Sequence, residues 1–178
     1  MVILLNGSFG VGKSTVAGLL RTALAGSRIY DPKIVGSVLM RLPTWIKLRG
    51  AGTGDFQNIV LWRKSVAAGI RLTKLIATGP VIVPMTFDRR DYLEEVTTVI
   101  RHFEPDLRIF CLRASLPVIR QRLIGRGTPL SGAGSEWIAR RVVECAIAHQ
   151  DPYFGLPIET EKHPAQEVAL AILEQLSV

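Results

Sequence analysis

Short apolar runs alternate along the chain with longer segments in which apolar residues recur at helical spacing. The runs Val2–Asn6 and Pro80–Pro84 are typical of strands that are buried on both faces of a sheet. Further strands are expected at residues 28–30, 107–112 and 156–160. Helices are expected at residues 16–25, 34–42, 55–77, 89–103 and 135–149, from Ser115 onward and from Pro164 onward. This alternation predicts one α/β domain, residues 1–178, with a five-stranded parallel sheet covered by helices on both faces.

The segment after the first run matches the G-x-x-x-x-G-K-[ST] pattern of a phosphate-binding loop, with a strand before it and a helix after it. Glycines let the backbone N–H groups turn toward phosphate oxygens, and the helix N-terminus adds the positive end of its dipole. A glycine-rich turn that matches by chance is the weaker alternative, because the flanking elements fit as well. We therefore expect nucleoside triphosphate binding by Gly7, Ser8, Gly10, Val11, Gly12, Lys13, Ser14 and Thr15.

Two side chains of this loop carry specific chemistry. Lys13 is placed to reach the terminal phosphates, and the Ser14 hydroxyl is a candidate ligand of Mg²⁺. Many nucleotide-binding proteins carry an aspartate at the end of a second buried strand, but here that place holds Pro84, Met85 and Thr86. Mg²⁺ is therefore expected to rely on Ser14 and waters, with Asp31 as a further candidate, and Asp88 is expected to cap the next helix.

Asp31 follows the second strand, at the edge where ligands bind in open α/β sheets. There it could accept the proton of an attacking hydroxyl or hold Mg²⁺ through water. The alternative is that Asp31 only opens a turn before Pro32. Its position at the crevice favours the functional interpretation.

The helix expected at residues 55–77 begins with a candidate cap, Asp55, and carries Trp62 beside Arg63. The ring and the guanidinium could grip a planar or anionic substrate group. Core packing of Trp62 with a solvated Arg63 is an equal alternative. The glycine-rich segment 49–54 before this helix is expected to be a loop, since no buried strand precedes it.

A second glycine-rich segment follows the arginines of the helix after Ser115. Residues 125–134 are rich in Gly, Ser and Pro, and residues 125–141 are predicted to form a mobile lid. The formal net charge of +7 permits nucleic-acid binding, but the arginines form no run and no basic patch interleaved with aromatic residues is visible. Phosphate clamping by arginines between Arg108 and Arg141 explains the charge better.

The remaining composition fits a soluble cytoplasmic protein. Cys111 and Cys145 are isolated and are expected to be buried free thiols. The N-terminal run lacks the basic flank of a cleavable signal. The longest uncharged stretch, residues 75–87, is too short for the ~20 residues of a membrane-spanning helix. His149 has no metal-ligand partner nearby in the sequence and is expected to be structural or exposed.

Several stretches together carry a family resemblance. They are the phosphate loop, Tyr30-Asp31-Pro32 with Gly36, Asp55-Phe56-Gln57, Leu61-Trp62-Arg63, Ile82-Val83-Pro84-Met85-Thr86 and Leu112-Arg113-Ala114-Ser115. On these residues the whole chain resembles the ATP-binding tunicamycin-resistance proteins (the TmrB-like family), within the shikimate- and nucleoside-kinase-like group of P-loop proteins. The loop is shared by many families, whereas the Asp-Phe-Gln, Leu-Trp-Arg and Val-Pro-Met-Thr segments are distinctive.

The resemblance implies a three-layer kinase-like fold with strand order 2-3-1-4-5, ATP and Mg²⁺ as cofactors, and a role against tunicamycin, a nucleoside antibiotic. By similarity to the small-molecule kinases, Asp31 falls at the catalytic base position, and Arg122 and Arg126 fall where lid arginines meet the transferred phosphoryl group. Lys13 completes the catalytic set. The candidate substrate-binding residues are Asp31, Phe56, Trp62 and Arg63.

Three hypotheses follow. A kinase would phosphorylate a hydroxyl of tunicamycin or a similar nucleoside-like compound. A binding module would instead sequester the drug in an ATP-dependent way without transfer. A nucleic-acid-associated NTPase, supported by charge alone, is the weakest. We expect a small-molecule substrate, no nucleic-acid partner and no membrane-spanning helix. A homodimer is possible.

Overall fold

The computed structural model describes residues 1–41, 55–132 and 135–177, except for the side chains of residues 38–41 and 56. Five parallel strands form one sheet in the order β2-β3-β1-β4-β5. The strands are β1 (Val2–Gly7), β2 (Arg28–Ile29), β3 (Val81–Pro84), β4 (Leu107–Arg113) and β5 (Leu156–Glu159). The predicted fold class and strand order are confirmed.

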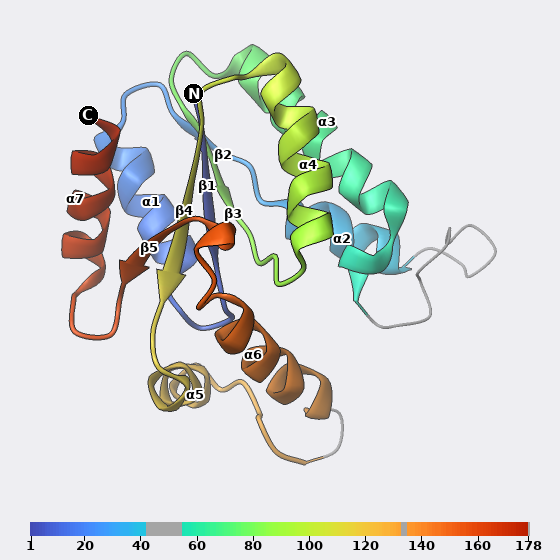
Figure 1. Cartoon of the computed structure of the whole chain (residues 1–178), viewed down its shortest axis with the longest axis vertical. Helices are drawn as coiled ribbons and strands as arrows, with labels where there is room; N and C mark the ends of the chain where they lie inside the picture. Colours follow the sequence, from blue (N-terminus) through green and yellow to red (C-terminus); the bar gives the residue numbers. More distant parts are fainter. Residues whose placement is uncertain (42–54, 133–134, 178) are drawn as a thin grey trace.

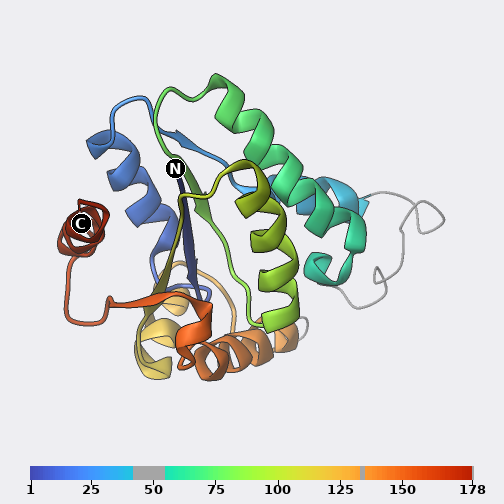
Figure 2. The ribbon, with the colours of Figure 1, turned by 45° about the horizontal axis from the view of Figure 1, so that its top comes forward.

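Helices cover both faces of the sheet (Figures 1 and 2). They are α1 (Lys13–Ala23), α2 (Pro32–Arg41), α3 (Val60–Ile76), α4 (Arg90–Phe103), α5 (Leu116–Gly125), α6 (Glu136–Ala148) and α7 (Ala165–Leu176), with 3-10 turns η2 (Phe56–Asn58) and η3 (Pro152–Phe154). Helices α1 and α7 lie on one face, and α3 and α4 lie on the other (Figure 2). Helices α5 and α6 lie at the carboxyl ends of the strands (Figure 1).

The central strand β1 divides the core into two layers because its side chains alternate between faces. Val2 and Leu4 pack with residues of α3 and α4, whereas Ile3 and Leu5 pack with residues of α1 and α7. All four side chains are fully buried. A strand that is apolar on both faces therefore holds the phosphate loop, which follows it directly, on a rigid base.

Two predicted helix caps are wrong. Asp55 Oδ1 accepts a hydrogen bond from Gln57 N at 2.9 Å, so Asp55 caps η2, and α3 begins only at Val60. Asp88 does not cap α4, because its carboxylate is bound by the guanidinium of Arg141. A charged guanidinium is a stronger partner for a buried carboxylate than a backbone N–H group.

Both cysteines are buried free thiols, as predicted. Burial raises the pKa of Cys145 to about 12, so its thiol stays protonated and behaves as an apolar group. Among the helices of the described residues, none combines the length and the apolar character that crossing a membrane would require.

Candidate active site

The phosphate loop joins β1 to α1 and encloses the ammonium group of Lys13. Gly7 has a φ of +143°, and a Cβ atom there would lie 2.6 Å from the carbonyl oxygen of Leu112. Gly12, with a φ of +108°, has nothing within 4 Å of such a Cβ, so the loop is open on this side. Lys13 Nζ donates hydrogen bonds of 2.8 Å to the carbonyl oxygens of Gly7 and Ser8. The loop therefore holds the lysine side chain within its own curve.

Burial changes the acidity of this lysine. The pKa of Lys13 is lowered from 10.5 to about 7, chiefly by desolvation and next by the charge of Lys33, whereas Asp31 acts in the opposite direction. Lys33 and Asp31 therefore lie close enough to Lys13 to act on its charge. An incoming polyphosphate would restore the ammonium form, because it brings negative charge to the same place.

A cavity of about 250 Å³ lies on one side of the phosphate loop. It is lined by Gly10, Val11, Gly12, Thr15, Val16, Arg122, Arg126, Thr160, His163, Pro164, Ala165 and Val168. Arg122 donates to the Thr160 carbonyl at 2.6 Å and to the Thr160 hydroxyl at 3.0 Å, which fixes its guanidinium beside the loop. Arg126 is exposed at the C-terminus of α5. The structure thus brings both predicted arginines to the loop.

The other arginines between Arg108 and Arg141 do not join this cavity. Arg108 pairs with Asp106, and Arg141 is held by Asp55 and Asp88. Burial alone would lower the pKa of Arg141, but the hydrogen bond and the charge of Asp88 raise it. The predicted clamp is therefore limited to Arg122 and Arg126 within the described residues.

Asp31 lies at the carboxyl end of β2, directly before α2. Its Oδ1 accepts a hydrogen bond from the backbone N of Lys33 at 3.0 Å, so it does form the turn that the sequence suggested as an alternative. Its half-buried carboxylate also lies near Lys13, as the effect on the lysine pKa indicates. The turn holds the Asp31 carboxylate in place, and both interpretations of Asp31 are compatible.

A second cavity of about 260 Å³ has mainly apolar walls. It is lined by Phe9, Pro32, Lys33, Ser37, Gln57, Trp62, Pro84, Met85, Thr86 and Trp137. Phe9, from the phosphate loop, contacts Trp137 of α6 edge to face with ring centroids 6.0 Å apart. Gln57 Oε1 and Thr86 Oγ1 are buried and have no hydrogen-bond partner in the described part of the chain. Both residues line the apolar cavity, and a few polar groups in an apolar cavity are the arrangement expected for recognition of a ligand.

Of the predicted substrate residues, Trp62 lines the second cavity and Arg63 does not. Trp62 is 1% exposed, belongs to the core, donates its Nε1–H to the Pro32 carbonyl at 3.1 Å and also lines the second cavity. Arg63 is buried and turned inward, with Nη1 2.7 Å from the Gln57 carbonyl and Nε 2.5 Å from Glu95. It is neither solvated nor exposed to the cavity. The side chain of Phe56 lies outside what the structure describes.

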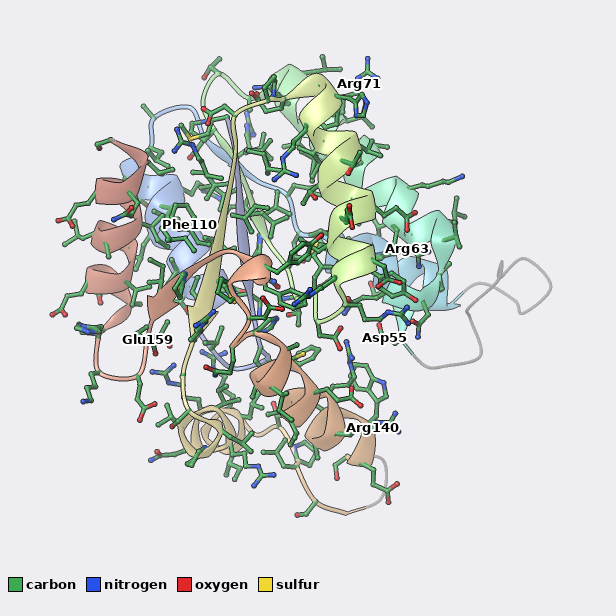
Figure 3. The ribbon with its side chains drawn as sticks, in the orientation of Figure 1. Asp55, Arg63, Arg71, Phe110, Arg140 and Glu159 are labelled. Carbon is green, nitrogen blue, oxygen red and sulfur yellow. The ribbon has the colours of Figure 1, made fainter. Side chains whose placement is uncertain are left out.

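Sequence reasoning missed Gln57, Thr86, Phe9 and Trp137, which come from four separate segments. Phe9, Gln57 and Thr86 lie in stretches that carry the family resemblance, and this was the one available signal. A charged cluster of Asp55, Arg140, Arg141 and Glu144 adjoins Gln57 and Trp137. Figure 3 labels Asp55 and Arg140 of this cluster. Figure 3 also shows Arg71 at the opposite end of the molecule, away from all of these residues.

The loop fits a nucleotide with Mg²⁺. The open face at Gly12 leaves room for phosphates, and the exposed Ser14 hydroxyl stands on the first turn of α1. No group of three or more acidic, histidine or cysteine side chains that could hold a metal occurs among the described residues. A metal ion at this place would therefore be shared with the nucleotide rather than held by protein carboxylates alone. The segment 125–141, which includes two residues outside the described part, stays a predicted lid.

The parallel sheet order, the phosphate loop and the flanking helices define a P-loop protein of the kinase-like α/β fold. Among solved structures, the chain is similar to the tunicamycin resistance protein of Deinococcus radiodurans, with a TM-score of 0.75, 22% identity and coverage of 99% of this chain and 96% of that one.

Two kinases show the same fold. A gluconokinase from Sinorhizobium meliloti matches with a TM-score of 0.63 and 20% identity, covering 98% of this chain and 92% of that one. A shikimate kinase from Acinetobacter baumannii matches with a TM-score of 0.60 and 18% identity, covering 99% and 92%. No protein-family model and no curated protein matches the sequence. The resemblance inferred from the sequence is thus confirmed at the level of the fold.

Proposed function

We propose that the protein is an ATP-dependent phosphotransferase that phosphorylates a hydroxyl of tunicamycin or of a similar nucleoside-like compound. One observation carries the proposal. The apolar cavity is lined by Phe9 of the phosphate loop and by Pro32 and Lys33, the two residues that follow Asp31. A compound in that cavity would have the phosphate loop and a carboxylate at its edge, and the nucleotide cavity lies beside the same loop.

The side chains can supply what phosphoryl transfer needs, which is positioning and charge neutralisation. Asp31 would accept the proton of the attacking substrate hydroxyl. The hydroxyl oxygen would at the same time form a bond to the γ-phosphorus of ATP, and the bond from that phosphorus to ADP would break. Lys13 and the two arginines beside the loop would offset the charge on the transferred group. ATP would supply the phosphoryl group and Mg²⁺ would neutralise its oxygens. The similarity to a tunicamycin resistance protein and to small-molecule kinases supports the choice of substrate and reaction.

The test is mass spectrometry of tunicamycin after incubation with the protein, Mg²⁺ and ATP. The expected product is heavier by one phosphoryl group, and fragmentation would locate the hydroxyl. Asp31→Asn should reduce turnover by at least about 100-fold, the lower end of what a general base contributes, while ATP affinity changes little. Asp151→Asn, on a carboxylate at η3, is the matched control and should keep full turnover.

Sequestration of the drug without transfer is the second candidate, favoured by the apolar walls of the cavity and by the lack of an acidic residue at the end of β3. It predicts unchanged tunicamycin together with ATP-dependent binding. That binding would survive Asp31→Asn and fail with Lys13→Ala. Unmodified drug with no binding would refute both candidates.

A further inference from the structure

A third, very small cavity lies behind the phosphate loop. Its volume is about 10 Å³, which is the space of about one water molecule. Residues of the loop, the end of β4, α5 and the end of α6 line it, among them Ser8, Arg113, Ile119 and His149. The phosphate loop, β4, α5 and α6 therefore meet at one point.

The buried polar atoms at this point are unusual. Seven buried side-chain nitrogen and oxygen atoms in the described residues have no hydrogen-bond partner, and four of them belong to residues lining this cavity. They are Ser8 Oγ, Arg113 Nε, Arg113 Nη2 and His149 Nδ1. Ser8 and His149 are each only 2% exposed, so bulk water does not satisfy them. A buried polar group without a partner costs about 1–3 kcal/mol, so four such atoms in one place indicate a bound partner.

The donor and acceptor roles of these atoms are fixed by their other contacts. His149 Nε2 lies 2.7 Å from the Phe87 carbonyl, which can only accept, so Nε2 carries the hydrogen. Burial chiefly lowers the pKa of His149 to about 4, and the neutral ring therefore presents Nδ1 as an acceptor. The Arg113 nitrogens can only donate, and the Ser8 hydroxyl can do either.

One water molecule matches this set completely. It can accept two hydrogen bonds from Arg113 and donate one to His149 Nδ1 and one to Ser8 Oγ. An anion fits less well, because the lone pair on Nδ1 would repel it. We propose that one ordered water occupies this cavity and that Arg113 and His149 act through it as positioning residues for the phosphate loop.

The consequence lies in the geometry of the loop. The carbonyl of Ser8 accepts a hydrogen bond from Lys13, so a displacement of Ser8 also displaces the lysine that meets the phosphates. The water ties Ser8 to the C-terminal end of α6, the helix whose N-terminal turn carries Trp137. Together with the contact between Phe9 and Trp137, it fastens the loop to α6 at two places. Nucleotide affinity therefore depends on residues that touch neither nucleotide nor substrate.

A double-mutant cycle tests the proposal on the full chain, with ADP as the probe in titration calorimetry. Ser8→Ala removes the hydroxyl. His149→Gln keeps an amide donor for the Phe87 carbonyl and replaces the ring acceptor at Nδ1 with an amide oxygen in a different position. Each variant should weaken ADP binding about 5-fold, and the double variant should lose little more than either one, because both remove the same water bridge. His102→Gln, on the exposed face of α4, is the matched control and should bind ADP unchanged.

Several outcomes would overturn the proposal. Independent effects, which multiply to about 25-fold in the double variant, would mean that Ser8 and His149 share no partner. If neither single variant affects ADP binding, the site does not position the phosphate loop. A high-resolution structure from crystals grown with bromide should show a water molecule in this cavity with four hydrogen-bond partners. An anomalous bromide peak there, or a direct bond between Ser8 and His149, would refute the water site. Neither readout needs phosphoryl transfer, so this proposal can fail while the proposed function stands.

Discussion

Raising the pH from about 7.5 to about 9 should weaken nucleotide binding as Lys13 loses its proton. The fall of its pKa from 10.5 to about 7 corresponds to a penalty of about 5 kcal/mol on the ammonium form. Nucleotide phosphates stabilise the charged form, so the bound lysine stays protonated over this range. Binding then requires the proton that the free protein has lost. The apparent affinity should fall about 25-fold between these pH values, and about 0.9 of a proton should be taken up near pH 8.

The sign for folding stability is opposite. Because the folded pKa lies below the unfolded one, the unfolded chain binds more protons between pH 7 and 10.5. The cost of burying the ammonium is therefore fully present below about pH 7 and is lost as the pH rises toward 10.5. Stability without nucleotide should rise across the range in which nucleotide affinity falls. Measuring both quantities separates Lys13 from a general loss of structure at high pH.

The assay is titration calorimetry with ADP in buffers of different ionisation enthalpy, which yields affinity and proton uptake together. Lys13→Arg keeps its charge at all these pH values and should flatten the profile. Lys33→Gln removes a charge that lowers the lysine pKa, so the fall in affinity should begin at a higher pH. If the ADP affinity of the unaltered protein does not change with pH and no proton is taken up near pH 8, the claim that Lys13 is neutral in the free protein is refuted.

Four other substitutions test the phosphate loop, its helix and the apolar cavity. Gly7→Ala should cost about 2–4 kcal/mol of unfolding free energy in denaturant, because it adds a Cβ against the Leu112 carbonyl at a positive φ. Gly18→Ala, on the open side of α1, should instead stabilise by up to about 1 kcal/mol. Gln57→Leu and Thr86→Val should each raise the KM for the acceptor about 5- to 10-fold, since each removes a hydrogen-bonding partner. Unchanged KM values would exclude these atoms from substrate recognition.

The parts of the site that the sequence predicts are those encoded within one short segment. The phosphate loop, Lys13 and the turn at Asp31 each depend on residues a few positions apart, and the strand before the loop is recognisable by its apolar run. Local spacing is sufficient there because the backbone itself builds the geometry.

The remaining parts depend on contacts between distant segments. Arg63 donates a hydrogen bond to Glu95, which is 32 positions away in the sequence. Asp88 accepts a hydrogen bond from Arg141, which is 53 positions away, instead of capping α4. Gln57 of η2 and Thr86, which follows β3, line one cavity although they are far apart in the sequence. Apart from the family resemblance of the stretches around Gln57 and Thr86, no local pattern distinguishes these side chains from ordinary polar residues, because their contacts form only when the layers assemble.

The two tryptophans that line the apolar cavity give the protein a built-in optical reporter. The chain has three tryptophans, of which Trp62 is buried and Trp137 is half-buried against Phe9. A compound entering between them would change the polarity and quenching around both indoles. In a Trp45→Phe variant, all tryptophan emission would come from the walls of this cavity. Occupancy could then be followed by intrinsic fluorescence in real time, without labelling either the protein or the compound.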